Sequence, residues 1–132
     1  MDFRSHIRNA VGKSQRGIEI GPSYSPILPK AEGFLTRVVD HTDAEGLRRK
    51  YAAMNVDVSK VEEVDAIDDG GEFGALDDDG GGFDFIVASH VFEHLPDPIH
   101  FLQRCERALK PDGRLFLLVP DRRFCFDYLR PT

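Results

Sequence analysis

The sequence predicts an α/β domain built on an open, mostly parallel sheet, and three observations lead to this prediction. Apolar runs of strand length alternate along the chain with segments of helical spacing. The run Phe83–Ser89 is almost entirely apolar or small, as expected of a parallel strand that is covered on both faces. A helix over residues 97–110 separates this run from a second apolar strand at 114–119, which favours a right-handed crossover between parallel strands.

The size and charge of the chain restrict its class. Its 132 residues are enough for one domain with a single core, here taken as 1–132. The net charge of −6 argues against a nucleic-acid backbone as partner, because phosphate binding requires a basic face. No window approaches the length of a membrane span, and the N-terminal residues contain no apolar segment typical of a signal peptide. We therefore expect a cytoplasmic protein without a membrane partner.

The elements of the first half follow from spacing and turn residues. Phe3, Ile7 and Val11 recur at helical spacing and predict a short amphipathic helix. Thr42 and Glu45 form a capping-box pattern, which predicts a helix through about residue 54. The strands expected in this half are Arg16–Ile20, 34–40 and a weaker one at 61–67.

Residues 68–82 form an acidic, glycine-rich segment in which Phe73, Ala75 and Leu76 are embedded. Such a composition buries little apolar surface. The segment is expected to be a flexible surface loop without a core element.

The helix of the second half has clear boundary signals. Asp97 is placed to cap it and Pro98 stands in its first turn. Its predicted buried stripe consists of Ile99, Leu102, Cys105, Ala108 and Leu109. Cys105 is expected to be a plain core residue, because neither it nor Cys125 fits a metal or redox spacing.

Three consecutive motifs carry a family resemblance: FDFIVAS at 83–89, HVFEHLPDP at 90–98 and LKPDG at 109–113. The chain resembles the class I, Rossmann-like methyltransferases that use S-adenosylmethionine, in particular the type 11-like group. The resemblance implies a three-layer sandwich with sheet order 3-2-1-4-5. The antiparallel strands that usually follow the fifth strand in that family are missing, so the chain is either a fragment or a minimal form. The fifth strand is then an apolar edge, which predicts a possible homodimer.

The resemblance also implies a cofactor site. The segment EIGPSYS at 19–25 takes the place of the family's glycine-rich first motif, with Gly21 in the tight turn and Ser23 where a small residue is expected. Glu19 would approach the methionine end, where negative potential suits a sulfonium cation. Asp40, about twenty residues further on, is expected to accept hydrogen bonds from the ribose hydroxyls. His41 either covers an edge of the adenosine or lies in an exposed turn.

The remaining cofactor contacts are expected at the ends of the third and fourth strands. Asp68 resembles the family's acidic residue that meets the adenine amino group, and Asp65 and Asp69 are rivals for this role. Ile67 would form an apolar wall for the ring. Ser89 and His90 would line the methionine half.

His90 is the candidate catalytic base, because imidazole titrates near neutral pH; alternatively, it only shapes the pocket. The pattern HxxEH at 90–94 also occurs in zinc enzymes, but Pro96 would end a helix too early for a zinc site, so no metal is expected. The resemblance implies methyl transfer from S-adenosylmethionine to an unidentified, small-molecule acceptor. The alternative is a non-catalytic, methyltransferase-like module for binding or assembly, since only one glycine remains in the first motif.

Overall fold

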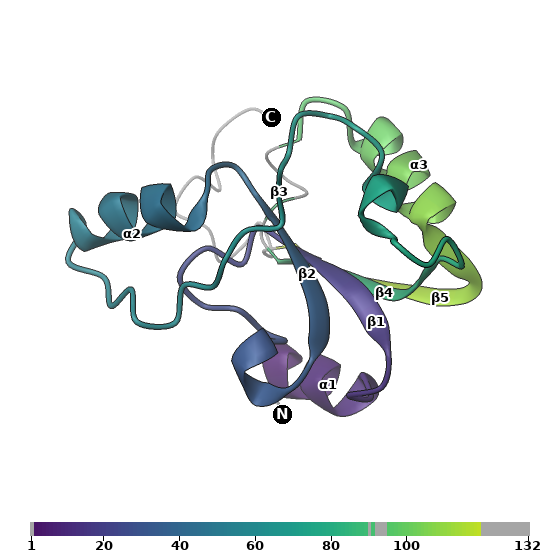
Figure 1. Cartoon of the computed structure of the whole chain (residues 1–132), viewed down its shortest axis with the longest axis horizontal. Helices are drawn as coiled ribbons and strands as arrows, with labels where there is room; N and C mark the ends of the chain where they lie inside the picture. Colours follow the sequence, from purple (N-terminus) through teal and green to yellow (C-terminus); the bar gives the residue numbers. More distant parts are fainter. Residues whose placement is uncertain (1, 90, 92–94, 120–132) are drawn as a thin grey trace, which may run out of the picture.

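The computed structural model describes residues 2–89, 91 and 95–119. Its sheet has five parallel strands in the order β3-β2-β1-β4-β5, which confirms the predicted class and strand order (Figure 1). None of the helices in this part of the chain is long and apolar enough to cross a membrane. The strands are β1 (Arg16–Ile20), β2 (Leu35–Asp40), β3 (Ala66–Ile67), β4 (Phe83–Ser89) and β5 (Leu109–Leu118).

Elements on both faces of the sheet make up the three predicted layers. On one face, α1 (Phe3–Ala10) buries Ile7 against Phe85 and Val87 of β4. On the other face, α3 (Pro98–Ala108) and the short 3₁₀ helix η2 (Phe73–Leu76) cover β1 and β4. The helix α2 (Ala44–Ala52) extends outward beside the β3 edge (Figure 1), and a second 3₁₀ turn, η1 (Lys30–Glu32), precedes β2.

Two boundaries before the acidic segment differ from the prediction. The strand expected at 61–67 is only the two-residue β3, because Val61 turns away from the sheet and is buried against Leu47 of α2. The capping box that begins at Thr42 is not used. Asp43 caps α2 instead, since its carboxylate accepts a hydrogen bond from the Gly46 amide at 2.8 Å.

The strand β5 begins five residues earlier than predicted, directly after α3. Its register against β4 changes at the start: Leu109 pairs with Phe83, whereas Arg114 pairs with Phe85. The four residues between them form an irregular excursion in which the turn sequence KPDG lies. Within the described part of the chain β4 is the one neighbour of β5, and pairing of this edge with a second copy stays a prediction.

The acidic segment 68–82 contains a core residue, so the prediction that it lacks one is wrong. Phe73 in η2 is only 2% exposed and packs edge-on against Phe101 of α3, with ring centroids 5.9 Å apart. The prediction was wrong because it rested on the average composition of the segment. A single buried aromatic side chain is enough to hold η2 against the sheet face.

The end of this segment is fixed by Asp77. One carboxylate oxygen accepts a hydrogen bond from the Arg16 guanidinium at 2.8 Å, and the other accepts one from the Gly82 amide at 2.6 Å. These contacts, Arg16 foremost, lower the pKa of Asp77 from 3.8 to about 2. A carboxyl group whose pKa is lower in the folded state stabilises the fold above its ordinary pKa.

The stability provided by Asp77 is therefore expected to disappear in acid. Urea unfolding should show wild type more stable than Asp77→Asn at pH 6, with a difference that shrinks below pH 4 as the pH falls toward the folded-state pKa of about 2. Asp112→Asn, at an exposed position, controls for the loss of one charge. A difference that stays constant from pH 6 to pH 2 would contradict this assignment.

Candidate functional site

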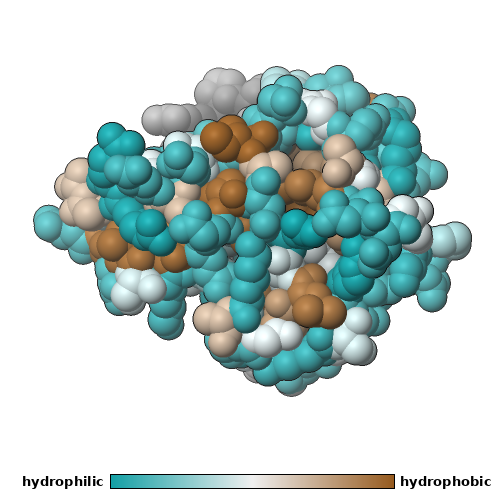
Figure 2. All heavy atoms as spheres, viewed as in Figure 1, coloured by the Kyte–Doolittle hydropathy of each residue, from teal (hydrophilic) through white to brown (hydrophobic). Residues whose placement is uncertain are grey.

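A cavity of about 780 Å³ lies at the edge of the sheet that the carboxyl ends of the strands form. In open α/β sheets this edge is where ligands bind. The surface view shows apolar patches between hydrophilic side chains across one face of the molecule (Figure 2). The residues that line the cavity are Arg4, Ile20, Gly21, Pro22, Ser23, Tyr24, Ser25, Asp40, His41, Lys50, Tyr51, Asp68, Ser89, Val91 and Leu95.

Six of the predicted cofactor-binding residues meet at this cavity, whereas two do not. Glu19 and Ile67 are absent from its lining, and His90 lies outside the described residues. The six that the fold brings together come from the ends of four strands and are Gly21, Ser23, Asp40, His41, Asp68 and Ser89.

Gly21 cannot be replaced without strain at the turn after β1. Its φ is +69°, and a Cβ there would stand 2.6 Å from Cγ2 of Val91. Its amide donates to the Val39 carbonyl at 2.7 Å, which ties the turn to β2. Ser23, two residues later, also has a positive φ of 54°. The serine therefore occupies a backbone conformation that glycine adopts more easily.

Asp40 at the end of β2 is a buried carboxylate, only 4% exposed. One oxygen, Oδ2, accepts a hydrogen bond from the Ser23 amide at 2.9 Å. The other, Oδ1, faces the His41 amide at 2.8 Å and His41 Nδ1 at 2.7 Å. These contacts fix the carboxylate at the cavity wall, while Oδ2 keeps a lone pair for a further donor.

Glu19 holds the loop that follows β1 instead of facing the cavity, which corrects its predicted place at the methionine end. Its side chain is 1% exposed, and its carboxylate accepts hydrogen bonds from the amides of Ile27 at 2.9 Å and Leu28 at 3.0 Å. Burial raises the pKa of this carboxyl group above its ordinary value. Residue 19 points away from the cavity because it lies on the sheet face that α1 covers, together with Phe85 and Val87.

The same loop is held from the other side by α1. Arg4 donates to the carbonyls of Ser25 at 3.2 Å and Pro26 at 2.9 Å, and Arg8 donates to that of Ile27 at 2.8 Å. Arg4 also lines the cavity and brings a cation to its rim. Sequence reasoning missed Arg4, because a lone arginine on an amphipathic helix carries no signal of its own.

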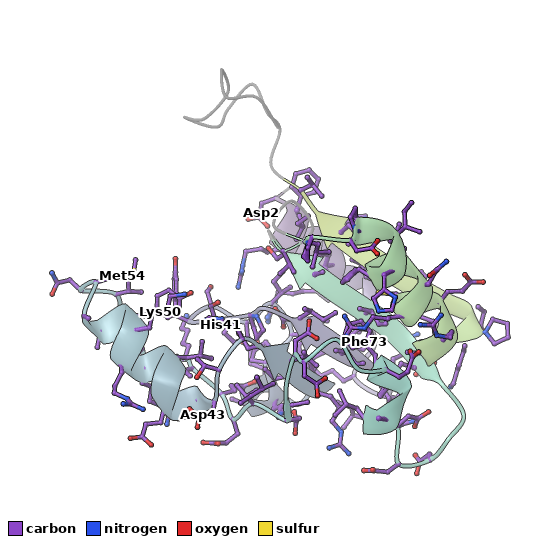
Figure 3. The ribbon with its side chains drawn as sticks, turned by 90° about the horizontal axis from the view of Figure 1, so that it is seen from above. Asp2, His41, Asp43, Lys50, Met54 and Phe73 are labelled. Atoms are coloured by element: carbon purple, nitrogen blue, oxygen red, sulfur yellow. The ribbon has the colours of Figure 1, made fainter. Side chains whose placement is uncertain are left out.

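Two tyrosines and a lysine form the side of the cavity next to α2. Tyr24 and Tyr51 meet edge to face with centroids 4.8 Å apart. Lys50 Nζ lies 5.1 Å from the centroid of the Tyr51 ring and 3.3 Å from His41 Nε2. Figure 3 shows Lys50 on α2 and His41 near it. Tyr24 lies within the first-motif segment 19–25, whereas no periodicity or motif in the sequence indicated Lys50 or Tyr51.

The structure separates the three candidate carboxylates near β3. Asp65 accepts from the Val38 amide and pairs with Lys30 at 2.6 Å, away from the cavity. Asp69 is exposed and accepts from the Gly71 amide at 2.8 Å. Asp68 alone of the three lines the cavity. Ile67, beside it, is 54% exposed and is not among the residues that line the cavity, so its predicted role as an apolar wall for the ring is not met here.

Comparison with known proteins decides the family. A family model described as a methyltransferase domain matches residues 9–131. The chain belongs to this family. It is an S-adenosylmethionine-dependent methyltransferase domain of class I, as its motifs predicted.

Curated relatives of this methyltransferase domain match over a short stretch. The ubiquinone biosynthesis O-methyltransferase of Haemophilus ducreyi is 45% identical over 40 residues, which are 30% of this chain and 17% of that protein. Its counterpart from Xanthomonas oryzae pv. oryzae is 43% identical over 42 residues, 32% of this chain and 18% of that protein. The match thus spans less than a fifth of either relative.

Solved structures show the same fold over most of the domain. A SAM-dependent methyltransferase from Aquifex aeolicus superposes with a TM-score of 0.60 at 15% identity, covering 91% of this chain and 65% of that one. The methyltransferase CalH, solved in complex with SAH, gives a TM-score of 0.52 at 21% identity and covers 78% of this chain and 31% of that one. At these identities the likeness establishes the fold.

Proposed function

We propose that this domain binds S-adenosylmethionine in the cavity at the strand ends and transfers its methyl group to a small-molecule acceptor. The observation that carries the proposal is the buried Asp40 carboxylate, fixed beside the positive-φ turn at Gly21. A Cβ at Gly21 would stand only 2.6 Å from Cγ2 of Val91, so this turn of the cavity wall requires glycine.

The adenosine half fits the part of the cavity between β2 and α2. Asp40 would accept a hydrogen bond from a ribose hydroxyl at Oδ2, and His41 would move aside if both hydroxyls bind. Asp68 would accept from the exocyclic amino group of adenine. Tyr24 and Tyr51 offer an aromatic surface beside these carboxylates.

The methionine half fits the part between β1 and β4. Gly21 and Ser89 line this part, because β1 and β4 are adjacent in the sheet. Arg4 would pair with the carboxylate of the methionine group, since its guanidinium lies on the rim and carries more donors than the two loop carbonyls use.

The bound cofactor supplies an electrophilic methyl group on a sulfonium, which leaves as a neutral thioether when the acceptor attacks in line. The domain contributes mainly by holding both partners in this geometry and by keeping water out. An acceptor that must lose a proton needs a base, and His90 keeps that proposed role. Its position in the sequence, directly after β4, supports it.

Binding of S-adenosylmethionine and S-adenosylhomocysteine is expected to be saturable by calorimetry. Asp40→Ala should weaken both by about 1–3 kcal/mol, because a charge-assisted hydrogen bond to the ribose is lost. Asp57→Ala, at an exposed position that does not line the cavity, is the matched control and should bind as wild type does. Circular dichroism confirms that each variant is folded.

Two results would count against this reading. Unchanged affinity in folded Asp40→Ala would remove Asp40 from the site. No binding of either compound by wild type would instead favour the non-catalytic binding or assembly module.

A further inference from the structure

Arg104 is a buried cation on α3, a helix that contributes no residue to the cavity lining. It is 5% exposed, and its guanidinium carbon lies 4.0 Å from the centroid of the Phe73 ring. Its Nε donates to the Gly71 carbonyl at 2.9 Å. A buried charge is costly unless it is paired, so the partner of this arginine matters.

That partner is Asp68, the carboxylate at the cavity. Arg104 donates from Nη2 to Asp68 Oδ1 at 2.8 Å, and the Gly70 amide donates to the same oxygen at 3.0 Å. The Asp68 amide donates to the Asp40 carbonyl at 3.0 Å, which fixes the backbone as well. No residue of the described chain donates to Oδ2 of Asp68.

We propose that Arg104 is a positioning residue for purine recognition: it clamps Oδ1 of Asp68 so that Oδ2 accepts a hydrogen bond from the 6-amino group of adenine. This inference rests on the proposed function. It goes beyond that function, because Arg104 does not line the cavity and yet determines which base the site accepts.

Arg104 limits the conformational freedom of the Asp68 side chain. The Asp68 side chain is 29% exposed and would sample several rotamers if nothing held it. Arg104 donates to both Asp68 and the Gly71 carbonyl, and these two hydrogen bonds restrict the Asp68 side chain before the ligand binds. Less side-chain entropy is therefore lost on binding.

A clamped carboxylate also discriminates between bases. An ionised carboxylate only accepts hydrogen bonds. It therefore favours a 6-amino purine, which donates, over a 6-oxo purine, whose oxygen is also an acceptor. A freely rotating Asp68 would turn away from a 6-oxo group and would lose this discrimination.

The test is the ratio of the dissociation constants of S-inosylhomocysteine and S-adenosylhomocysteine, which differ in the 6-substituent and in the proton that the 6-oxo base carries on N1. Wild type should prefer the adenosine compound by about tenfold to a hundredfold, the range for one hydrogen bond to a charged group. Asp68→Ala should bring the ratio close to one. Arg104→Met should lower it at least threefold, and adding Arg104→Met to Asp68→Ala should lower it no further.

Arg107→Met is the matched control. Arg107 lies on the same helix and pairs with Glu72 of the same acidic segment at 2.7 Å, but both side chains are about half exposed. The ratio should stay at the wild-type value in this variant. If Arg104→Met does not fold, Arg104→Lys replaces it, since lysine keeps the charge but cannot donate to Gly71 and Asp68 in the same planar arrangement.

If Arg104 had only a structural role, its replacement would change the melting temperature but not the ratio of the two dissociation constants. An unchanged ratio in folded Arg104→Met or Arg104→Lys, with wild-type binding intact, would overturn the inference while the proposed function stands. Failure of wild type to bind either compound would overturn both.

Discussion

Truncation of Phe73 to alanine is expected to destabilise the fold by about 3–5 kcal/mol, the usual cost of removing a buried aromatic side chain. Phe73 is 2% exposed, belongs to the main core cluster, and contacts both the Phe101 ring and the Arg104 guanidinium. Its loss leaves a cavity under η2 and exposes the guanidinium on one side. Urea unfolding followed by circular dichroism measures the effect.

Phe3→Ala is the control for this experiment, because Phe3 is 73% exposed and its truncation should change the free energy of unfolding by less than about 0.5 kcal/mol. A small effect of Phe73→Ala would mean that η2 detaches readily from α3. In that case residues 68–82 would behave as the flexible loop that their composition predicts.

Replacement of Glu19 by alanine is the second change with a large expected effect. It leaves the buried amides of Ile27 and Leu28 without an acceptor, at about 1–3 kcal/mol for each, or about 2–6 kcal/mol together. Glu106→Ala, at an exposed position on α3, should be close to neutral. Stability equal to wild type in Glu19→Ala would show that the loop finds other partners.

The pH dependence of Glu19 follows from the same burial. Its folded-state pKa is raised above the ordinary 4.5, so the folded state binds the proton more tightly than the unfolded state does. The contribution of Glu19 to stability is therefore complete below pH 4.5 and is lost as the pH rises through the folded-state pKa. The free energy of unfolding of wild type should fall relative to that of Glu19→Gln over this range, and a parallel course of the two would contradict it.

The strands and the site could be predicted to different degrees. The continuous apolar run of β4 and the cap at Asp97 are local signals, and both elements form where the sequence placed them. The buried stripe of α3 was predicted less well: Ile99 is 68% exposed, whereas Arg104 is buried. Hydrophobicity alone cannot indicate a buried arginine, since its partners, Phe73 and Asp68, are more than thirty residues away.

The cavity residues also differ in how well the sequence predicts them. Gly21, Asp40 and Asp68 follow strands and could be inferred from strand ends, because parallel strands bring these positions to one edge. Arg4 and Tyr51 reach the cavity from helices, and their positions depend on how those helices pack. Glu19 was misplaced because the side of the sheet that a strand residue faces depends on the register, which a five-residue strand does not reveal.

The position of Arg4 matters for handling the protein in the laboratory. The cap of α1 is Asp2 (Figure 3), and the first turn of this helix already carries Arg4, which lines the cavity. An acidic tag joined ahead of Asp2 would lie close to Arg4, and its carboxylates would compete with the proposed ligand for this arginine. Cleavage of the tag before titration keeps measured affinities free of this interference.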